Sequence, residues 1–580
     1  MSEFEREDDL SFESEESAEG SQSAIFNDEE SIDVDQYEPE FGEEDPNDEW
    51  AARARSVEDD LVARIPEHKL RPRLEPTRRA VELLGDPQKA YRVIHVTGTN
   101  GKTSTTRFIE RILREHGLRT GRFTSPHLVR LNERMAIDGE PVSNERLYTV
   151  WQEIKPLIEI IDAQLEAEGD TRLTFFEALA VLGFAVFADA PVDVLVLEVG
   201  MGGEWDSTNV ADGDVAVFTP ISMDHAERLG DTIAEIAATK SGIIKEGAYV
   251  LSSAQPAEAM PVLQAKAAEL AEAFASYGPQ FELIETIATD LGQTFSVRTL
   301  AGEYHDIHLP VHGEYQAQNA ALAIAAVEAF MGAGNQRIMD DIVRASLADA
   351  SSPGRLQVIH RDPLVILDAA HNPGGAESLA HALATTFGKP YAVGVLAALG
   401  DKDATGFFEL LDDSLVEVVI TQSDSPRAVP AEELAVTARK VFGEDRVHVS
   451  KHPLEAIELA SGLTADQVVE ELPDDIDDGS RYAQVPHKNE LDLGRRLVFR
   501  FGAGQFLLST AAIGVVAWLA GVKPIASLVI GAALAMSSTA IVIPALAERR
   551  KLGSASGRTT FSILLFQDLA VVPLLVLIPA

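Results

Sequence analysis

Residues 92–104 read RVIHVTGTNGKTS, an apolar β-branched run followed by a glycine-rich turn. The next stretch, Thr103–His116, carries apolar residues at helical spacing, and Gly117 suits the end of that helix. A strand, a glycine-rich turn and a helix in this order can hold polyphosphate, because the backbone N–H groups of the turn and the helix N-terminus attract anions. We expect Lys102 to reach the β- and γ-phosphates of a nucleotide and Thr103 to hold Mg²⁺. The apolar helix face consists of Phe108, Ile109, Ile112 and Leu113.

The glycines are not spaced as in the most common phosphate-binding loop. A strict G-x-x-x-x-G-K pattern needs glycine at position 96, where this chain has Val96, and the glycines here are Gly98 and Gly101. The alternative is a plain tight turn between a strand and a helix. The Gly-Lys-Thr sequence, placed between a β-branched run and an amphipathic helix, favours the phosphate loop.

Strand-like and helical stretches alternate from about residue 51 to about residue 472. Such alternation predicts α/β domains whose parallel sheets are covered by helices on both faces. A linker is expected at Ser346–Arg355, which gives a larger nucleotide-binding domain over 51–350 and a smaller C-terminal α/β domain over 351–472. The predicted strands are Arg92–Val96, Val192–Val199, Val215–Thr219, Tyr249–Ser252, Leu364–Asp368, Tyr391–Leu396 and Val416–Thr421.

Composition excludes several classes of function. The 580 residues include no cysteine, which rules out disulfides, thiolate catalysis and cysteine-ligated metals. The formal charge of −45, from 48 Lys+Arg and 93 Asp+Glu, argues against nucleic-acid binding because an acidic surface repels phosphate backbones. Residues 1–50 carry 21 acidic side chains and one Arg, so we expect a disordered acidic tail and no signal peptide there.

The composition changes again after a seam at 473–492. Residues 497–521, 525–547 and 560–579 are long, mostly uncharged stretches, each sufficient to cross a bilayer. We expect about three transmembrane helices within 493–580, because three such stretches in succession are unusual for buried core helices. Basic residues before the first stretch and between the second and third place the preceding domains in the cytoplasm. These residues are Arg495, Arg496, Arg500, Arg549, Arg550, Lys551 and Arg558.

Several further motifs accompany the phosphate loop. They are FTSPHL at 123–128, NER at 132–134, LEVGMGG at 197–203, DSTN at 206–209, MDH at 223–225, LGDT at 229–232 and KSGIIK at 240–245. In this order and spacing they resemble, over about residues 55–465, the bifunctional dihydrofolate synthase/folylpolyglutamate synthases of the Mur-ligase superfamily. Two departures are Thr103, where many relatives have Gly, and Glu204-Trp205, where many have Arg-Leu. We expect Glu204 to alter the loop beside the substrate.

The resemblance implies a P-loop Mur-ligase-like ATPase domain, a Rossmann-like C-terminal domain, and an ATP-dependent carboxylate–amine ligase. ATP would phosphorylate the carboxylate of dihydropteroate or a reduced folate, and the amine of L-glutamate would attack the acyl phosphate. Two Mg²⁺ ions are implied, with Lys240 carbamylated so that it offers an oxygen ligand. The alternative is an unmodified Lys240 that pairs with phosphate. The implied metal ligands are Thr103, Ser125, Glu198, His225 and Lys240.

The remaining site residues also follow from the resemblance. The implied nucleotide-binding residues are Thr99, Asn100, Gly101, Lys102, Thr103, Ser104, Asn319, Arg355, Asp368 and His371, and the implied catalytic residues are Lys102, His225, Lys240, Arg355 and His371. Glu198 is expected at the carboxyl end of a strand, where open α/β sheets bind ligands, and His225 at the end of another. Asp401-Lys402-Asp403 is expected at the same cleft. Glu177 is expected either to stabilise a helix start or to support the metal ligands.

The residues from about 489 resemble part of a Kef-type monovalent cation:proton antiporter. The matching pieces are FGAGQFL at 501–507, MSSTAI at 536–541 and LLFQDL at 564–569. That family is built from inverted repeats with about a dozen spans, so we expect no transport by this chain alone. The last strand of the ligase family is absent before this segment. We therefore interpret the join as a recombined reading frame, rather than a natural fusion or a membrane anchor.

Three functions compete on these grounds. The leading one is a folate–glutamate ligase that acts as a cytoplasmic monomer, with membrane attachment through 493–580 left open. The second is a cell-wall Mur ligase, against which the sequences at 125–128 and 240–243 argue. The third is a membrane transport protein with a fused soluble module.

Overall fold

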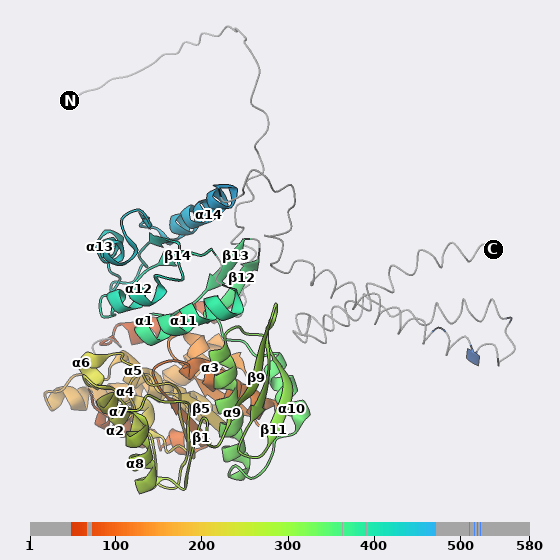
Figure 1. The fold of residues 1–580 in the computed structure, drawn as a ribbon. Coiled ribbons are helices and arrows are strands. Elements are labelled where there is room, and N and C mark those ends of the chain that lie inside the picture. Colours follow the sequence, from red (N-terminus) through yellow and green to blue (C-terminus); the bar gives the residue numbers. More distant parts are fainter. Residues whose placement is uncertain are drawn as a thin grey trace, which may run out of the picture.

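The computed structural model describes residues 48–66, 72–361, 363–388 and 391–470, with five isolated positions between 510 and 523 (Figure 1). Within these residues no helix combines the length and the apolar character needed to span a bilayer. The predicted acidic tail lies outside the described residues except for positions 48–50. The predicted membrane-spanning stretches of 493–580 also lie outside them, except for the five isolated positions.

An eight-stranded sheet forms the centre of the larger lobe. Its strands lie in the order β4-β3-β2-β5-β1-β6-β7-β8. The last six strands in this order, β2, β5, β1, β6, β7 and β8, run parallel to one another. The predicted parallel sheet is confirmed, and the antiparallel edge of β3 and β4 adds to it. The bounds are β1 Arg92–Thr97, β2 Thr120–Phe123, β3 Met135–Ile137, β4 Glu140–Pro141, β5 Val194–Glu198, β6 Val215–Phe218, β7 Tyr249–Ser252 and β8 Ala273–Ser276.

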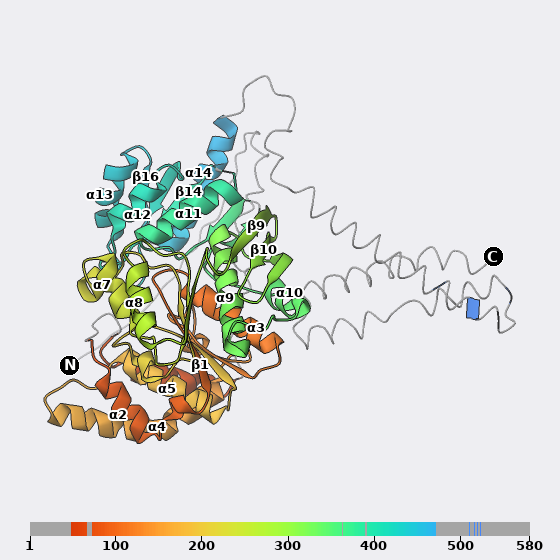
Figure 2. The same cartoon turned by 60° about the horizontal axis from the view of Figure 1, so that its bottom comes forward.

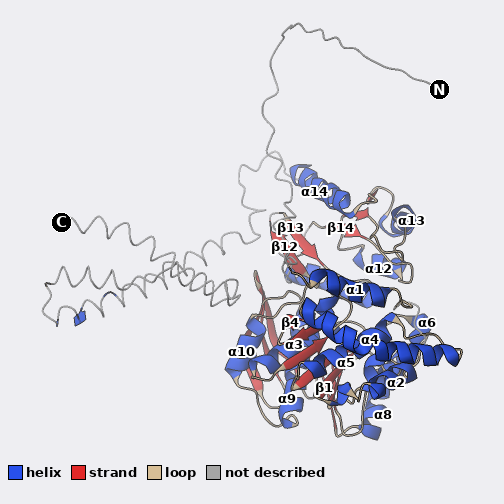
Figure 3. Ribbon diagram, turned by 180° about the vertical axis from the view of Figure 1, so that it is seen from behind, coloured by secondary structure: helices blue, strands red, loops and turns tan. Residues whose placement is uncertain are grey.

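Helices cover both faces of this sheet, which explains why its central strands are apolar throughout. Alternate residues of β1 point to opposite sides, so Ile94 packs with α3 and α9 while Val93 packs with α4 and α5. The predicted apolar face of α3 is fully buried. Figure 3 shows α1, α2, α4 and α5 together on the second side. The helix bounds are α1 Ala51–Val62, α2 Glu75–Leu83, α3 Lys102–Glu115, α4 Asn144–Ala167, α5 Phe175–Asp189, α6 Ala226–Leu229, α7 Ile233–Ser241, α8 Met260–Leu270 and α9 Glu314–Gly332.

A small antiparallel sheet, not predicted from the sequence, packs beside α9. It consists of β9 Glu282–Thr289, β10 Gly292–Arg298 and β11 Glu303–Leu309 in the order β11-β10-β9. Helix α10, Asp340–Ala348, covers the same core. The predicted linker Ser346–Arg355 was therefore wrong at its start, because Ser346 and Leu347 are buried residues of α10 and the connection begins only after it.

The C-terminal lobe is a smaller α/β unit that follows this connection. Strands β14 Val393–Leu396, β15 Glu417–Ile420 and β16 Val447–Val449 form a parallel sheet, and β12 Gln357–Arg361 pairs antiparallel with β13 Leu364–Leu367. Within the described residues β16 is followed by helix α14, and no further strand comes after it. Figure 2 shows α11 on the side of this lobe that meets the larger one. The helices are α11 Pro373–Thr386, α12 Ala404–Leu411, α13 Ala431–Phe442 and α14 Pro453–Glu470.

A histidine lies in the centre of the large sheet. His95 of β1 is fully buried, and its Nε2 lies 2.9 Å from the Thr208 hydroxyl, which in turn donates to the Asp206 carboxylate. Asp206 also accepts a hydrogen bond from the backbone N–H of Met201, at 2.8 Å. Burial, with a smaller contribution from the charge of Lys245, lowers the pKa of His95 to about 3.

This histidine makes the fold sensitive to acid. Between pH 6.5 and about 3 the unfolded chain binds a proton at His95 that the folded chain does not, so stability falls as the pH falls through this window. We expect His95→Gln to reduce the fall in the free energy of unfolding by up to about 1.4 kcal/mol for each pH unit. Urea unfolding at pH 7, 6 and 5 measures it, with the exposed His452→Gln as the control. Equal pH dependence in both variants would contradict the assignment.

Candidate active site

A cavity of about 440 Å³ lies between the two lobes, beyond the carboxyl ends of β1 and β5. All the residues implied as metal-binding, nucleotide-binding or catalytic line this cavity, although they come from segments as far apart as 99 and 371. The structure thus brings them together in one place. They are Thr99, Asn100, Gly101, Lys102, Thr103, Ser104, Ser125, Glu198, His225, Lys240, Asn319, Arg355, Asp368 and His371.

The glycine-rich turn is held by two close backbone approaches. A Cβ added to Gly98 would lie 1.9 Å from the Thr219 hydroxyl, and one added to Gly101 would lie 2.7 Å from the Asn319 side-chain oxygen. Gly101 also has a φ of 84°, which a side chain would strain, and it precedes the first residue of α3. The turn therefore needs glycine at both positions, although their spacing is not the common one.

Two lysine side chains meet on the inner side of this turn. Lys240, from α7, donates to the Gly98 carbonyl at 2.8 Å, and Lys102 donates to the same carbonyl at 3.2 Å and to that of Thr99 at 3.1 Å. Burial lowers the pKa of both ammonium groups, and the charge of Lys102 helps to bring that of Lys240 to about 7. An anion bound here would relieve the repulsion between them.

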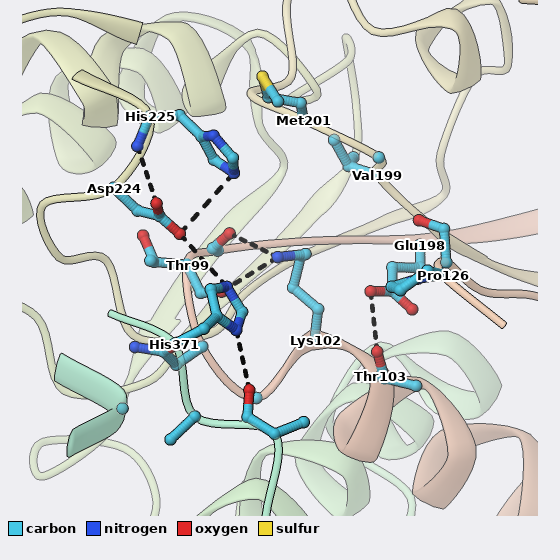
Figure 4. A pocket seen from close by; sticks show the side chains of 18 of the residues that line it. Thr99, Lys102, Thr103, Pro126, Glu198, Val199, Met201, Asp224, His225 and His371 are labelled. Atoms are coloured by element: carbon cyan, nitrogen blue, oxygen red, sulfur yellow. Dashed lines mark hydrogen bonds and ion pairs between the residues drawn. The ribbon is translucent and has the colours of Figure 1, made fainter. Parts of the chain in front are cut away.

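A buried carboxylate faces the phosphate loop from β5. Glu198 is the last residue of that strand and is 1% exposed. One of its oxygens accepts from the Thr103 hydroxyl at 3.0 Å, while the other has no hydrogen-bond partner (Figure 4). Burial raises the pKa of Glu198 to about 7, although the charge of Lys102 and the bond from Thr103 oppose the rise. The predicted place of Glu198 at a strand end is confirmed.

His225 stands across the cavity from Glu198 (Figure 4). Its prediction as a strand-end residue was wrong, because β6 ends at Phe218 and His225 instead precedes α6 with a left-handed φ of 52°. Burial lowers the pKa of His225 to about 4, despite the nearby Asp224 carboxylate, so the ring is neutral at pH 7. Burial alone would raise the pKa of Asp224, but His225, Lys402 and His371 hold it at about 2.

The C-terminal lobe supplies the opposite wall of the cavity. Asp368, just after β13, accepts from the backbone N–H groups of Leu356 and Ala370, both at 2.7 Å. His371 holds its Nδ1 2.8 Å from the Ala369 carbonyl and its Nε2 3.8 Å from Asp224. Arg355 lines the cavity beside them. Three residues of this lobe therefore lie at the cavity, opposite the phosphate loop.

Some neighbouring predictions need correction. Asp401 and Lys402 line the cavity, but Asp403 instead caps α12 by accepting from the Gly406 N–H at 3.0 Å. Glu177 forms a capping box with Thr174 and pairs with Arg73 at 2.8 Å, which supports its role at a helix start. Glu204 does not line the cavity.

Asp224 and Asn372 contact each other across the two lobes, although no role for either was predicted from the sequence. Both stand beside residues for which a role was predicted, and their contacts appear only when the two lobes meet. Asp206, the first residue of the DSTN motif, holds the loop after β5 by accepting from the Met201 N–H. Only the three-dimensional arrangement shows these contacts. The Asn372–Asp224 contact joins segments that are distant in the sequence, and the Asp206–Met201 contact depends on how one turn folds.

The donor set suits a magnesium–nucleotide complex. Within the described residues no three His, Asp or Glu side chains cluster as a metal cage. Mg²⁺ however usually takes one or two carboxylates and keeps water and substrate phosphates as its other ligands. The unpartnered oxygen of Glu198, beside the Thr103 hydroxyl and with Ser125 in the same cavity, fits such a site.

The comparisons with known families agree with this geometry. Residues 96–327 match the Mur ligase middle domain, and residues 354–469 match the Mur ligase glutamate ligase domain. Residues 488–580 match the transmembrane domain of sodium/hydrogen exchangers. The resemblances expected from the sequence are therefore confirmed for both parts of the chain.

Individual relatives support the same assignment. The dihydrofolate synthase/folylpolyglutamate synthase of Mycobacterium tuberculosis is 44% identical over 431 residues, which are 73% of this chain and 88% of that protein. The Bacillus subtilis enzyme of the same name is 36% identical over 66% of this chain and 89% of its own length.

Solved structures give the same result. The M. tuberculosis folylpolyglutamate synthase complexed with ADP and AMPPCP has a TM-score of 0.69 at 42% identity, over 73% of this chain and 94% of that chain. The folylpolyglutamate synthase of Thermotoga maritima has a TM-score of 0.60 at 30% identity, over 70% of this chain and 91% of that chain. From the sequence motifs, the two-lobed fold and these matches, the chain belongs to the dihydrofolate synthase/folylpolyglutamate synthase family of Mur ligases.

Proposed function

We propose that the protein is an ATP-dependent ligase that adds L-glutamate to dihydropteroate, to reduced folates, or to both. The observation that carries the proposal is the buried Glu198 carboxylate, with one oxygen unpartnered, beside a phosphate loop in a cavity closed by a second lobe. The names of the relatives support the substrates, and solved relatives hold ADP, AMPPCP and folate. The match to the two Mur ligase domains supports lobes near 51–350 and 351–472.

The reaction runs in two displacements. A carboxylate oxygen of the pterin substrate attacks the γ-phosphorus of ATP, and the bond from that phosphorus to the β–γ bridging oxygen breaks, which releases ADP. The amine nitrogen of glutamate then attacks the acyl carbon, and the C–O bond to phosphate breaks. The proton that the amine loses as the amide forms ends on the released phosphate, which leaves as HPO₄²⁻. The first step converts a carboxylate oxygen, a poor leaving group, into a phosphate, and the second step expels that phosphate. The protein's task in both is chiefly to position the reacting groups and to neutralise charge.

The residues of the cavity divide these tasks. The backbone N–H groups at the start of α3 would bind the phosphates, with Lys102 offsetting their charge from the inner side of the turn. Arg355 would approach from the other lobe. Glu198 and Thr103, with Ser125, would hold one Mg²⁺, and His225 and a carbamylated Lys240 a second. Bound Mg²⁺ would neutralise charge on the transferring phosphoryl group.

Substrate choice separates this ligase from a cell-wall Mur ligase. The purified full chain is incubated with ATP, L-glutamate and either dihydropteroate, tetrahydrofolate or a UDP-muramyl substrate, and phosphate release is followed. We expect release with at least one of the two pterins. Release with the UDP-muramyl substrate alone would overturn the proposal.

Lys102→Ala tests the assigned phosphate loop. Removal of the ammonium leaves the phosphoryl charge without its inner neutralising group, so we expect ATP turnover to fall at least about 100-fold. Phosphate release at saturating pterin and glutamate measures it. Lys89→Ala, at an exposed lysine, is the matched control and should keep full activity. Retained turnover in Lys102→Ala would contradict the loop assignment.

Lys240→Ala distinguishes a carbamate from a free ammonium at this position. Both forms lose activity when the side chain is removed, but a small molecule that replaces the lost group should restore part of it. We expect acetate or formate to raise the turnover of Lys240→Ala at least about tenfold, because each supplies carboxylate oxygens. Rescue by methylamine alone would instead support the unmodified lysine. Lys266→Ala, which removes a surface ion pair with Glu269 away from the cavity, serves as the control.

The exchanger-like segment is proposed to transport no ion by itself. Residues 488–580 match a transmembrane family, which supports membrane attachment of the ligase part. Taken by themselves, these residues are fewer than the two inverted repeats of a transporter require. The full chain in proteoliposomes should therefore show K⁺ and proton fluxes no greater than those of empty vesicles. Fluxes above that level would contradict the prediction.

A further inference from the structure

Two asparagine side chains join the phosphate loop directly to the C-terminal lobe. Asn100 Nδ2 donates to Asn372 Oδ1 at 3.2 Å, and Asn372 Nδ2 donates to Asn100 Oδ1, also at 3.2 Å. Asn372 is the N-cap of α11, where its oxygen also accepts from the Gly375 N–H at 2.8 Å. The first turn of α11 is packed closely here, since a Cβ on Gly374 would lie 3.1 Å from Asn100 Nδ2. The phosphate loop is therefore in direct contact with the first turn of α11.

An ion pair beside the asparagines makes the second connection. Asp224 of the larger lobe accepts from Lys402 Nζ at 2.8 Å and from Asn372 Nδ2 at 3.1 Å. The Lys402 side chain is 9% exposed, and within the described residues its two polar contacts, Asp224 and His225, both belong to the other lobe. A lysine buried in this way is costly unless its partner stays in place, so the pair favours the closed arrangement of the lobes.

We propose that Asn100, Asp224, Asn372 and Lys402 form an interlobe clasp that holds the C-terminal lobe on the phosphate loop. The clasp acts through position: it places Arg355, Asp368 and His371 at the cavity, and Asn372 and Lys402 are positioning residues rather than catalytic ones. The inference deepens the proposed ligase function and rests on it for the effect on turnover. The geometry of the clasp itself is independent of the substrate.

Asn372→Ser tests the clasp with little disturbance of α11. Serine is a good N-cap, so the helix start keeps its cap, but the shorter side chain cannot reach Asn100 or Asp224. Asn335→Ser, at an exposed asparagine, is the matched control. Because the chain has no cysteine, spin labels attach only at cysteines that are introduced. Glu82→Cys on α2 and Glu433→Cys on α13 provide one exposed position on each lobe.

Double electron–electron resonance then measures the interlobe distance, with and without AMPPCP, and phosphate release measures kcat and KM. We expect Asn372→Ser to broaden or lengthen the distance distribution, and to lower kcat about tenfold, the effect of losing one to two hydrogen bonds. The control should change neither. The midpoint of thermal unfolding should stay close to that of the control, which separates lobe position from stability.

The distance measurement does not depend on the assigned substrates, so it fails or succeeds separately from the proposed function. An unchanged distance distribution in Asn372→Ser would overturn the clasp, whatever happens to activity. A changed distribution with unchanged kcat would overturn its positioning role. If Asn372→Ser does not fold, Lys402→Met removes the ion pair instead, and the same two outcomes decide.

Discussion

The close packing of the phosphate loop against β6 determines where the other groups of the cavity can lie. Gly98 sits so near Thr219 that no side chain could be added, and its carbonyl receives both Lys102 and Lys240. Because β1 lies between β5 and β6, the same loop faces Glu198 at the end of β5. One tight turn in the middle of a parallel sheet therefore brings two ammonium groups and one carboxylate into a common space.

The charges in this space are more costly without a ligand than with one. Burial lowers the pKa of Lys240 to about 7 and raises that of Glu198 to about 7, so each resists its charged form. A polyphosphate would favour the ammonium form of Lys102, and a divalent cation would favour the Glu198 carboxylate. The neutral amine that burial favours at Lys240 is the form that the proposed carbamylation requires. The charges of the site are therefore complementary to those of a metal–nucleotide complex. The C-terminal lobe completes the enclosure by contacts that begin at the phosphate loop itself.

Sequence patterns predicted the parts of this arrangement that depend on local or repeated features. The β-branched run, the glycine turn and the apolar face of α3 predicted the centre of the sheet, and the family resemblance pointed to residues that line the cavity. The strands β9 to β11 were missed because polar residues interrupt all three of them, so none contains a continuous apolar run. Strand β10 is nevertheless largely buried, whereas β9 and β11 have several exposed positions. The left-handed start of α6 at His225 and the contacts of Asp224 and Asn372 were missed because they arise only when distant segments meet.

Transfer of oxygen from the acid to phosphate tests the account most directly. Dihydropteroate or tetrahydrofolate labelled with ¹⁸O in the reacting carboxylate is turned over with ATP and L-glutamate, and the released phosphate is analysed by mass spectrometry. If the cavity holds the acid in line with the γ-phosphorus, each phosphate carries one labelled oxygen from the broken acyl bond. Unlabelled phosphate formed together with the amide product would contradict the account, since the acid would then not have been phosphorylated.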